Sequence, residues 1–484
     1  MRTSYAGSGA SAENNGKAEN SREYDGREDS GGNPLLTEKI ETQLVQLALP
    51  LLFGNILQQC YHIADALIIG RFLGTDAFAA AGVAGTVMNL MIFALNGFCT
   101  GVSILFSTLY GLGNKQKFRE ELFVALVFGS LFTGIVTAVS MAGMGQLLQW
   151  IHTPVYLYGY ASEYLSVIAG GMIVTYSYNL LSGILRSVGD TRASLKFLAV
   201  AVTGNVALDF LFVAAFGWGV RGAACATVFS QAAAAAGCFW YLKQAYGELL
   251  CTRRDVGLHR ELFKNTVRYG FASALQESSL YIGKILVQGA VNLLGTPGIA
   301  GFTAASRLEG FANSFCDSGA LATSVMISQN YGAGNRQRVT DGVKKSLLMH
   351  GALGIAIPLI LFTLAGPGVN LFLGTGNTCA LDQGAGYLRI VSVFYILCFV
   401  GSSLVGFFRG IGKVHIPVIG TTLNISIRVV LAYGLTKRWG LAGLGAATGI
   451  GWMMVVGYQM ISLLYMRRNG GLQQQVTTAK SQRQ

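Results

Sequence analysis

About twelve apolar stretches, each long enough to cross a lipid bilayer, follow one another along most of this chain. A transmembrane helix needs roughly 20 mostly apolar residues, whereas a transmembrane strand needs only about 10. Only 12% of the residues are charged, about half the share of a soluble domain. The sequence therefore predicts an all-α polytopic membrane protein, with spans near residues 44–69, 77–108, 121–144, 160–183, 194–216, 222–242, 265–293, 299–330, 344–366, 385–408, 414–436 and 441–465.

The basic residues predict the orientation of these spans. Of the 35 Lys and Arg residues, 27 fall in the termini and in every second loop, and only 4 fall in the remaining loops. Cytoplasmic loops carry such an excess. We therefore expect a multi-pass plasma-membrane protein with both termini and the loop 243–264 in the cytoplasm. The same distribution explains the net charge of +12 without a nucleic-acid partner.

Parts of the chain recur at a spacing of 221 residues. YGLGNKQKF begins at Tyr110 and YGAGNRQRV at Tyr331, while Leu-Gly-Thr begins at Leu73 and again at Leu294. Six spans separate the copies, so the two halves have the same orientation and form parallel repeats. The expected domains are a disordered cytoplasmic tail (1–36), an amino-terminal six-helix lobe (37–242), a cytoplasmic linker (243–264), a carboxy-terminal six-helix lobe (265–468) and a second disordered cytoplasmic tail (469–484).

The first span carries a carboxylate, Asp65. An ionised Asp at the centre of a span costs about 2.5–3.5 kcal/mol on insertion scales, so the acid is expected to face protein or water. Gln58, Tyr61 and Asp65 have the spacing of one helical face, which predicts one wall of a polar cavity. The alternative is an Asp at a helix end, in the headgroup layer.

A second acid follows in the same half. Asn205 and Asp209 are four residues apart and share a helical face, and Thr227 on the next span is positioned to point toward them. Burial and mutual repulsion disfavour two adjacent negative charges, so this group is suited to hold a proton or Na⁺. The alternative is a purely structural polar network between helices.

The second half has a different set of charges. Glu277, Tyr281 and Lys284 follow one face of the seventh span, which makes an internal Glu–Lys ion pair plausible, with either a structural or a functional role. Glu309 and Asp317 on the eighth span are candidates for a central cavity. The position that corresponds to Asp65 in the repeat is Leu286, so the charge layout is not repeated.

Motifs of enzymes and metal sites are absent from the sequence. It contains no GxxxxGK[ST] nucleotide-binding loop, which argues against an ATP-driven pump. The eight Cys residues make no CxxC pair, and most lie in apolar stretches where Cys behaves as a small hydrophobe. We therefore expect no enzyme activity, no cofactor and no metal, apart from H⁺ or Na⁺ as a coupling ion at Asp65 and Asp209.

At this point the sequence resembles a known family. The stretch PLLFGNILQQCYHIADALIIGRFLGTDAFAAAG, the two YGxGN turns, GILRSVGDT and NVALD followed by GVRGAACAT are similar to multidrug and toxic compound extrusion (MATE) transporters, over about residues 36–468. The resemblance implies two six-helix lobes arranged as a V and drug export driven by H⁺ or Na⁺.

The resemblance also implies functional residues. Asp65, Asn205, Asp209 and Thr227 match the cation-site pattern of the family's amino-terminal lobe. An Asn often present on the fourth span has no direct counterpart, so Ser182 or Asn179 would take its place. Glu277 resembles the span-seven acid of a Na⁺-linked branch, whereas Gly270 and Phe271 stand where a Pro often occurs. These features leave the coupling ion open.

The leading hypothesis is a secondary active exporter of small amphiphilic, mainly cationic compounds, which works by alternating access as a monomer. One alternative is a flippase for lipid-linked oligosaccharides of the same superfamily. Such flippases tend to have a strongly cationic cavity and extra helices, whereas only four basic residues lie within the spans here. A channel or a non-transporting receptor is a second alternative, which the internal duplication disfavours.

Overall fold

The computed structural model describes residues 33–150, 153–257, 259–373 and 378–468, and all regular elements in these ranges are helical. The amino-terminal half forms α1 (Pro34–Thr37), α2 (Ile40–Leu112), α3 (Lys115–Ala142), α4 (Met144–Trp150), α5 (Val155–Gly170), α6 (Met172–Ser187), α7 (Thr191–Asp209), the π-helix η1 (Phe210–Ala215) and α8 (Gly219–Ala245). The carboxy-terminal half forms α9 (Arg260–Asn292), α10 (Gly295–Gly332), α11 (Arg336–Thr363), α12 (Ala365–Leu373), α13 (Thr378–Gly410) and α14 (His415–Arg468).

These helices form the twelve membrane spans of a two-lobe fold. The longest two, α2 and α14, each contain two spans, because the backbone breaks at Gly74 and Gly440. Another span is shared by α5 and α6, which are bent by 49° at the junction between them. The helices α9 and α10 are long enough to span the membrane, but their apolar runs are interrupted by charged residues.

The backbone conformation of the glycines confirms the parallel repeat. Gly74 and Gly295, which are 221 residues apart, have φ angles of 86° and 70°, a region that side chains with a Cβ rarely adopt. The same left-handed conformation recurs in three further pairs, Gly113 and Gly334, Gly189 and Gly412, and Gly219 and Gly440. Each pair marks a turn or break between two spans, so both halves reverse direction at equivalent points.

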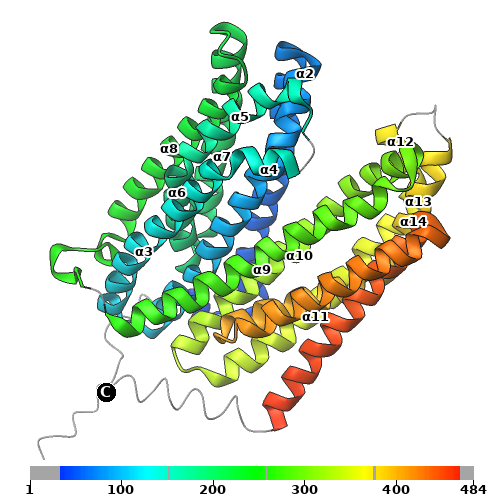
Figure 1. Ribbon diagram of the computed structural model, residues 1–484. Helices are drawn as coiled ribbons and strands as arrows, with labels where there is room; N and C mark the ends of the chain where they lie inside the picture. The colour runs from blue at the N-terminus through cyan, green and yellow to red at the C-terminus, as the bar shows by residue number, and fades with distance from the viewer. Residues whose placement is uncertain (1–32, 151–152, 258, 374–377, 469–484) are drawn as a thin grey trace, which may run out of the picture.

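The two lobes meet at one end of the molecule and diverge toward the other, like the arms of a V (Figure 1). We call the closed end the linker end, because it carries residues 246–257, which follow α8 and lead toward α9. There the Gln329 side chain donates a hydrogen bond to the Ser187 carbonyl at 2.6 Å, and the Thr266 hydroxyl donates to Glu121 at 2.7 Å. Nearer the middle, Asn55 donates to Ser318 at 3.0 Å. The lobes are therefore joined by polar contacts over the linker-end half.

The ordered structure begins before the point that the composition indicates, because a helical turn precedes α2. Residues 33–36 were expected in a disordered tail, but Pro34–Thr37 forms a helical turn capped by the Asn33 side chain. Leu35 is buried against α10, and its carbonyl accepts a hydrogen bond from Asn330 at 3.0 Å. One apolar side chain thus anchors this turn. The remaining parts of the two expected tails, 1–32 and 469–484, lie outside the described residues.

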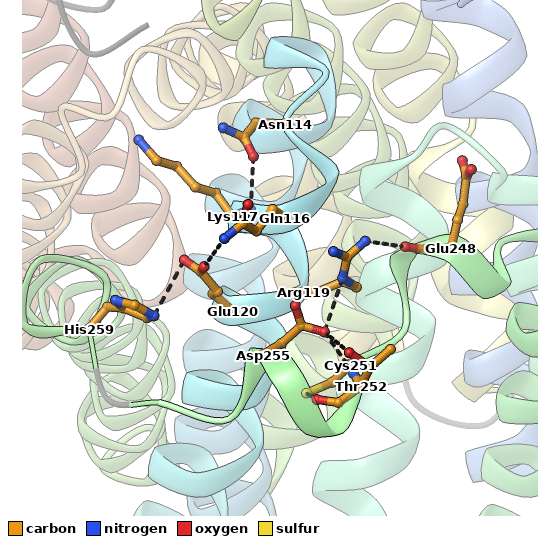
Figure 2. A network of polar contacts seen from close by, with 10 residues as sticks. All are labelled: Asn114, Gln116, Lys117, Arg119, Glu120, Glu248, Cys251, Thr252, Asp255 and His259. Carbon is orange, nitrogen blue, oxygen red and sulfur yellow. Dashed lines mark hydrogen bonds and ion pairs between the residues drawn. The ribbon is translucent and has the colours of Figure 1, made fainter. Parts of the chain in front are cut away.

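The linker is attached to the start of α3 (Figure 2). The Arg119 guanidinium donates hydrogen bonds to Asp255 at 3.0 Å and to the Glu248 carbonyl at 3.1 Å. Asp255 also accepts hydrogen bonds from the backbone and the hydroxyl of Thr252. These bonds, together with the Arg119 charge, hold the pKa of Asp255 below its usual range. The attachment is therefore complete at neutral pH and weakens as the pH falls through this lowered pKa.

Replacing Arg119 with Gln is expected to free the linker. Asp255 is only 6% exposed and would lose its ionic partner, whereas Arg253 and Arg254 beside it are exposed cleavage sites for trypsin. Limited proteolysis should therefore cut R119Q at these arginines several-fold faster than the wild type. The matched control is Lys115→Gln, which removes an ion pair with exposed partners, a kind worth about 0–1 kcal/mol. Equal cleavage of R119Q and wild type would show that Arg119 does not hold the linker.

Candidate functional site

Two acids in the amino-terminal lobe come together from separate helices. Asp65 lies on the first half of α2, and Asp209 is the last residue of α7, where the chain continues into the π-helix η1. Short π-helical segments are frequent at functional sites. Asp209 is fully buried and Asp65 is half-buried, and the two carboxyl groups are near enough for their charges to act on each other. The fold thus brings two carboxyl groups from separate helices into one polar region of the amino-terminal lobe.

Neutral polar groups surround this acid pair. The Asn205 amide, in the orientation that satisfies its hydrogen bonds, donates to Asp209 Oδ2 at 2.9 Å and accepts from the Thr227 backbone at 3.1 Å. The Tyr61 hydroxyl lies 3.4 Å from the Thr227 hydroxyl. The structure thus gathers Asp65, Asn205, Asp209 and Thr227, four of the candidate cation ligands, and adds Tyr61, which the sequence placed on a cavity wall. We refer to the five residues as the acid-pair site.

The acid-pair site has unused acceptor capacity. Asp65 Oδ1 and Asp209 Oδ1 are both buried and have no hydrogen-bond partner among the residues that the structure describes. An unpaired buried carboxylate oxygen is costly, and two adjacent negative charges repel. A proton or a Na⁺ ion between the carboxyls would remove both penalties. Carboxylate, amide and hydroxyl oxygens are also the ligand types that a hard cation prefers.

The structure does not bring Ser182 or Asn179 into this site. The Ser182 hydroxyl lies 2.8 Å from that of Ser194 and accepts a hydrogen bond from Arg186 at 2.9 Å. Asn179 donates to the carbonyl of Thr175, one turn back on its own helix. In the described part of the chain neither side chain hydrogen-bonds to Asp65 or Asp209. Gln58, on the same helical face as Tyr61, is exposed.

In the carboxy-terminal lobe, the expected ion pair between Glu277 and Lys284 is not formed. Glu277 instead binds Arg409 of α13 at 2.9 Å, and Arg409 also donates to Gln276. Glu277 and Lys284 are seven residues apart, which corresponds to about 10 Å along the helix axis, and Arg409 lies closer to the Glu277 carboxylate. Arg409 directly follows the predicted tenth span (385–408), so its position in the sequence places it among the basic residues of a cytoplasmic loop. Its partner lies 132 residues away, which no local pattern reveals.

Lys284 and Tyr281 contact the opposite lobe. The Lys284 ammonium lies 5.7 Å from the centre of the Phe93 ring, a cation–π contact, and Tyr281 stacks on the same ring at 5.0 Å. Glu309 accepts a hydrogen bond from Tyr387 at 3.2 Å, and Asp317 is exposed although it lies within α10. These residues do not join the acid-pair site. The two lobes thus share a scaffold and differ in polar chemistry.

Replacing Arg409 with Met is expected to destabilise the protein by about 3 kcal/mol, because removal of one partner leaves a largely buried charge on Glu277. Lys284→Met should cost about 1 kcal/mol, since it removes a ring contact. The double variant E277Q/R409M should recover most of the loss. Denaturation of the purified protein in detergent measures all three changes. A double variant that is less stable than R409M would contradict this assignment.

Comparison with known proteins agrees with this architecture. The MatE family model matches residues 50–211 and 272–434, one match in each half. The chain is 27% identical over 419 residues to "Probable multidrug resistance protein YpnP" of Bacillus subtilis, with 85% of this chain and 92% of that protein covered. It is 24% identical to "Probable multidrug resistance protein NorM" of Thermotoga maritima, with coverages of 85% and 89%.

Solved structures show the same fold. "Crystal structure of MATE in complex with MaL6" aligns with a TM-score of 0.83 at 23% identity and covers 93% of this chain and 99% of that one. "Outward-facing conformation of a multidrug resistance MATE family transporter of the MOP superfamily" aligns with a TM-score of 0.82, at the same identity and coverage. The duplicated match, the twelve spans and the two lobes lead to one conclusion: this chain belongs to the MatE family of multidrug and toxic compound extrusion transporters.

Proposed function

We propose that this chain is a multidrug exporter that exchanges small amphiphilic, mainly cationic compounds for H⁺ or Na⁺ by alternating access across the plasma membrane. The acid-pair site is the observation that carries the proposal. Two adjacent carboxylates repel each other, and binding of a cation between them relieves this repulsion. The names of YpnP and NorM, as probable multidrug resistance proteins, support the substrate class.

The orientation of the molecule is part of the proposal. The linker end carries most of the loops with an excess of Lys and Arg, so it faces the cytoplasm. The observed V then opens to the outside and represents the state from which a drug leaves and a cation enters. The chain acts as a monomer, without a cofactor or a nucleic-acid partner.

The site suits an exchange cycle because the ion and the drug have to favour different states. A ligand shifts a conformational equilibrium only by its difference in affinity between the two states. A cation at Asp65 and Asp209 neutralises the acid pair and favours one arrangement of α2 against α7. A cationic substrate favours the ionised pair through its charge. Each ligand therefore displaces the other, and this competition couples their movements.

Transport in proteoliposomes tests the function. The purified chain is reconstituted, and uptake or release of a fluorescent organic cation is followed under H⁺ and Na⁺ gradients that are imposed separately. We expect transport against the drug gradient with at least one of the two ions. The control is the E163Q variant, which changes only an exposed ion pair with Arg221. Drug movement that is independent of both gradients would reject the antiport mechanism.

A further inference from the structure

A cavity of about 670 Å³ lies between the lobes at the linker end. Its walls come from both lobes: from the end of α2 and the start of α3 on one side, and from α9, α10 and the turn between α13 and α14 on the other. The volume is in the range of small-molecule sites. The cavity is separate from the acid-pair site, since they share no residue.

Four cations line this cavity without a partner. Lys117 comes from the amino-terminal lobe, and Arg260, Arg268 and Lys413 come from the carboxy-terminal lobe. Within the described ranges none of these side chains forms an ion pair. Arg268 and Lys413 line the same cavity, and the charges of both act on His415. Such a convergence of unpaired cations attracts an anion.

The two acids on the amino-terminal wall each have at least one polar partner. Glu120 lies 3.6 Å from His259 and accepts a hydrogen bond from Gln116. Glu121 accepts one at Oε1 from Thr266 across the lobe boundary, whereas its Oε2 is buried without a partner among the described residues. A third acid, Glu261, lies in the exposed first turn of α9. The helix α9 also starts at this cavity, so its amino-terminal dipole adds to the positive potential. Lys117 lines the cavity from the lobe opposite to the other three cations.

Most of the remaining lining is apolar, apart from Thr108 and Asn265. Leucine and isoleucine side chains from both lobes form it, together with two tyrosines: Leu105, Leu109, Leu112, Leu262, Ile411, Tyr269 and Tyr331. A cationic group beside an apolar wall suits an amphiphile with a phosphate group. We propose that this cavity binds a phosphate-bearing anion, supplied either as the headgroup of an acidic lipid or as a soluble phosphate compound.

Such a ligand would act on the conformational equilibrium. The cavity exists because the lobes are together at the linker end, so an anion that contacts Lys117 on one lobe and Arg268 and Lys413 on the other binds this closed end. It therefore shifts the population toward the V that is open at the opposite end. This inference requires no assignment of the coupling ion and no knowledge of the drug.

The test is the thermal unfolding of the purified full-length chain in neutral detergent, titrated with four probes. The probes are phosphatidylglycerol, phosphatidylcholine with the same acyl chains, glycerol 1-phosphate and inorganic phosphate. Ligands that bind only the folded state raise the unfolding temperature, and the increase grows with the logarithm of the ligand concentration once this exceeds the Kd. The variants are R268Q/K413Q, K117Q on the opposite lobe, and the control R253Q/R254Q, which removes two exposed charges from the linker.

We expect phosphatidylglycerol to stabilise the wild type and the R253Q/R254Q control, and phosphatidylcholine to have no effect. Affinity should fall about tenfold for each cation removed, so about 100-fold in R268Q/K413Q and tenfold in K117Q. Stabilisation by glycerol 1-phosphate or inorganic phosphate would identify a soluble source, and stabilisation by phosphatidylglycerol alone would identify a lipid source. If no probe stabilised the wild type, or if R268Q/K413Q bound as tightly as the control, the proposal would be wrong.

Discussion

Replacing Asp65 or Asp209 with Asn is expected to abolish gradient-driven efflux while the protein stays folded in the membrane. Asn preserves the shape and can fill the hydrogen bonds of the acid-pair site, but it neither takes up a proton nor pairs with a cation. Because the charges of the two carboxyls act on each other, loss of one is expected to disable the exchange. The double variant should be scarcely worse than either single one, since residues that act as a unit are not additive.

Efflux of a fluorescent cation from cells with matched expression measures this effect. We expect D65N, D209N and D65N/D209N to fall to the level of cells without the transporter. E163Q should keep wild-type efflux. Wild-type efflux by both single variants at normal expression would move the coupling site to the carboxy-terminal lobe, where Glu277 and Asp317 are the candidates.

The second large effect is expected at the glycines where the lobes touch. A Cβ on Gly111 would lie 2.1 Å from the Gln329 carbonyl oxygen, and one on Gly332 would lie 2.0 Å from the Thr108 carbonyl oxygen. Both neighbours are backbone, so the lobes themselves must move apart. Gly111→Val and Gly332→Val should therefore prevent closure of the linker end and reduce transport at least about tenfold, because one state of the cycle is lost.

A buried reporter shows whether the linker end has opened. The Ser107 side chain is fully buried and donates to the Val325 carbonyl across the lobe boundary. A Cys at position 107, in a background without other reactive thiols, should react with a water-soluble maleimide at least about tenfold faster in G111V than in the parent. The matched control is Gly85→Val on the same helix, where a Cβ meets no atom within 4 Å. Equal reactivity in G111V and G85V would show that Gly111 does not control this closure.

The fold follows from the sequence because a membrane leaves little choice. Backbone groups in a bilayer have to be satisfied within each span, so a long apolar stretch becomes a helix. The repeat of 221 residues also predicts turns at equivalent positions in the two halves, and Gly74 and Gly295 indeed share a left-handed backbone conformation. What the sequence did not predict is local: the π-helix after Asp209, the bend at Gly170–Gly171, and the helical turn anchored by Leu35.

The candidate site could be predicted only in part. Asp65 and Asp209 are conspicuous because a carboxylate in an apolar span is costly, and Asn205 shares a helical face with Asp209. The partners that come from distant helices required the fold. Ser182 was a plausible ligand by its position, but Arg186, one turn later on the same helix, binds it. Glu277 pairs with Arg409 because the fold brings these two side chains of α9 and α13 within 2.9 Å, and not because of any spacing in the sequence.

The central claim is that the acid pair exchanges its cation for substrate, and ion release on substrate binding tests it most directly. A lipophilic organic cation is added to the purified protein in a weakly buffered, Na⁺-free solution with a pH indicator, and then again in the presence of Na⁺. We predict that the wild type releases about one proton per bound substrate, that Na⁺ suppresses this release, and that D65N/D209N releases none. Substrate binding without displacement of either ion, or equal proton release by D65N/D209N, would contradict the account.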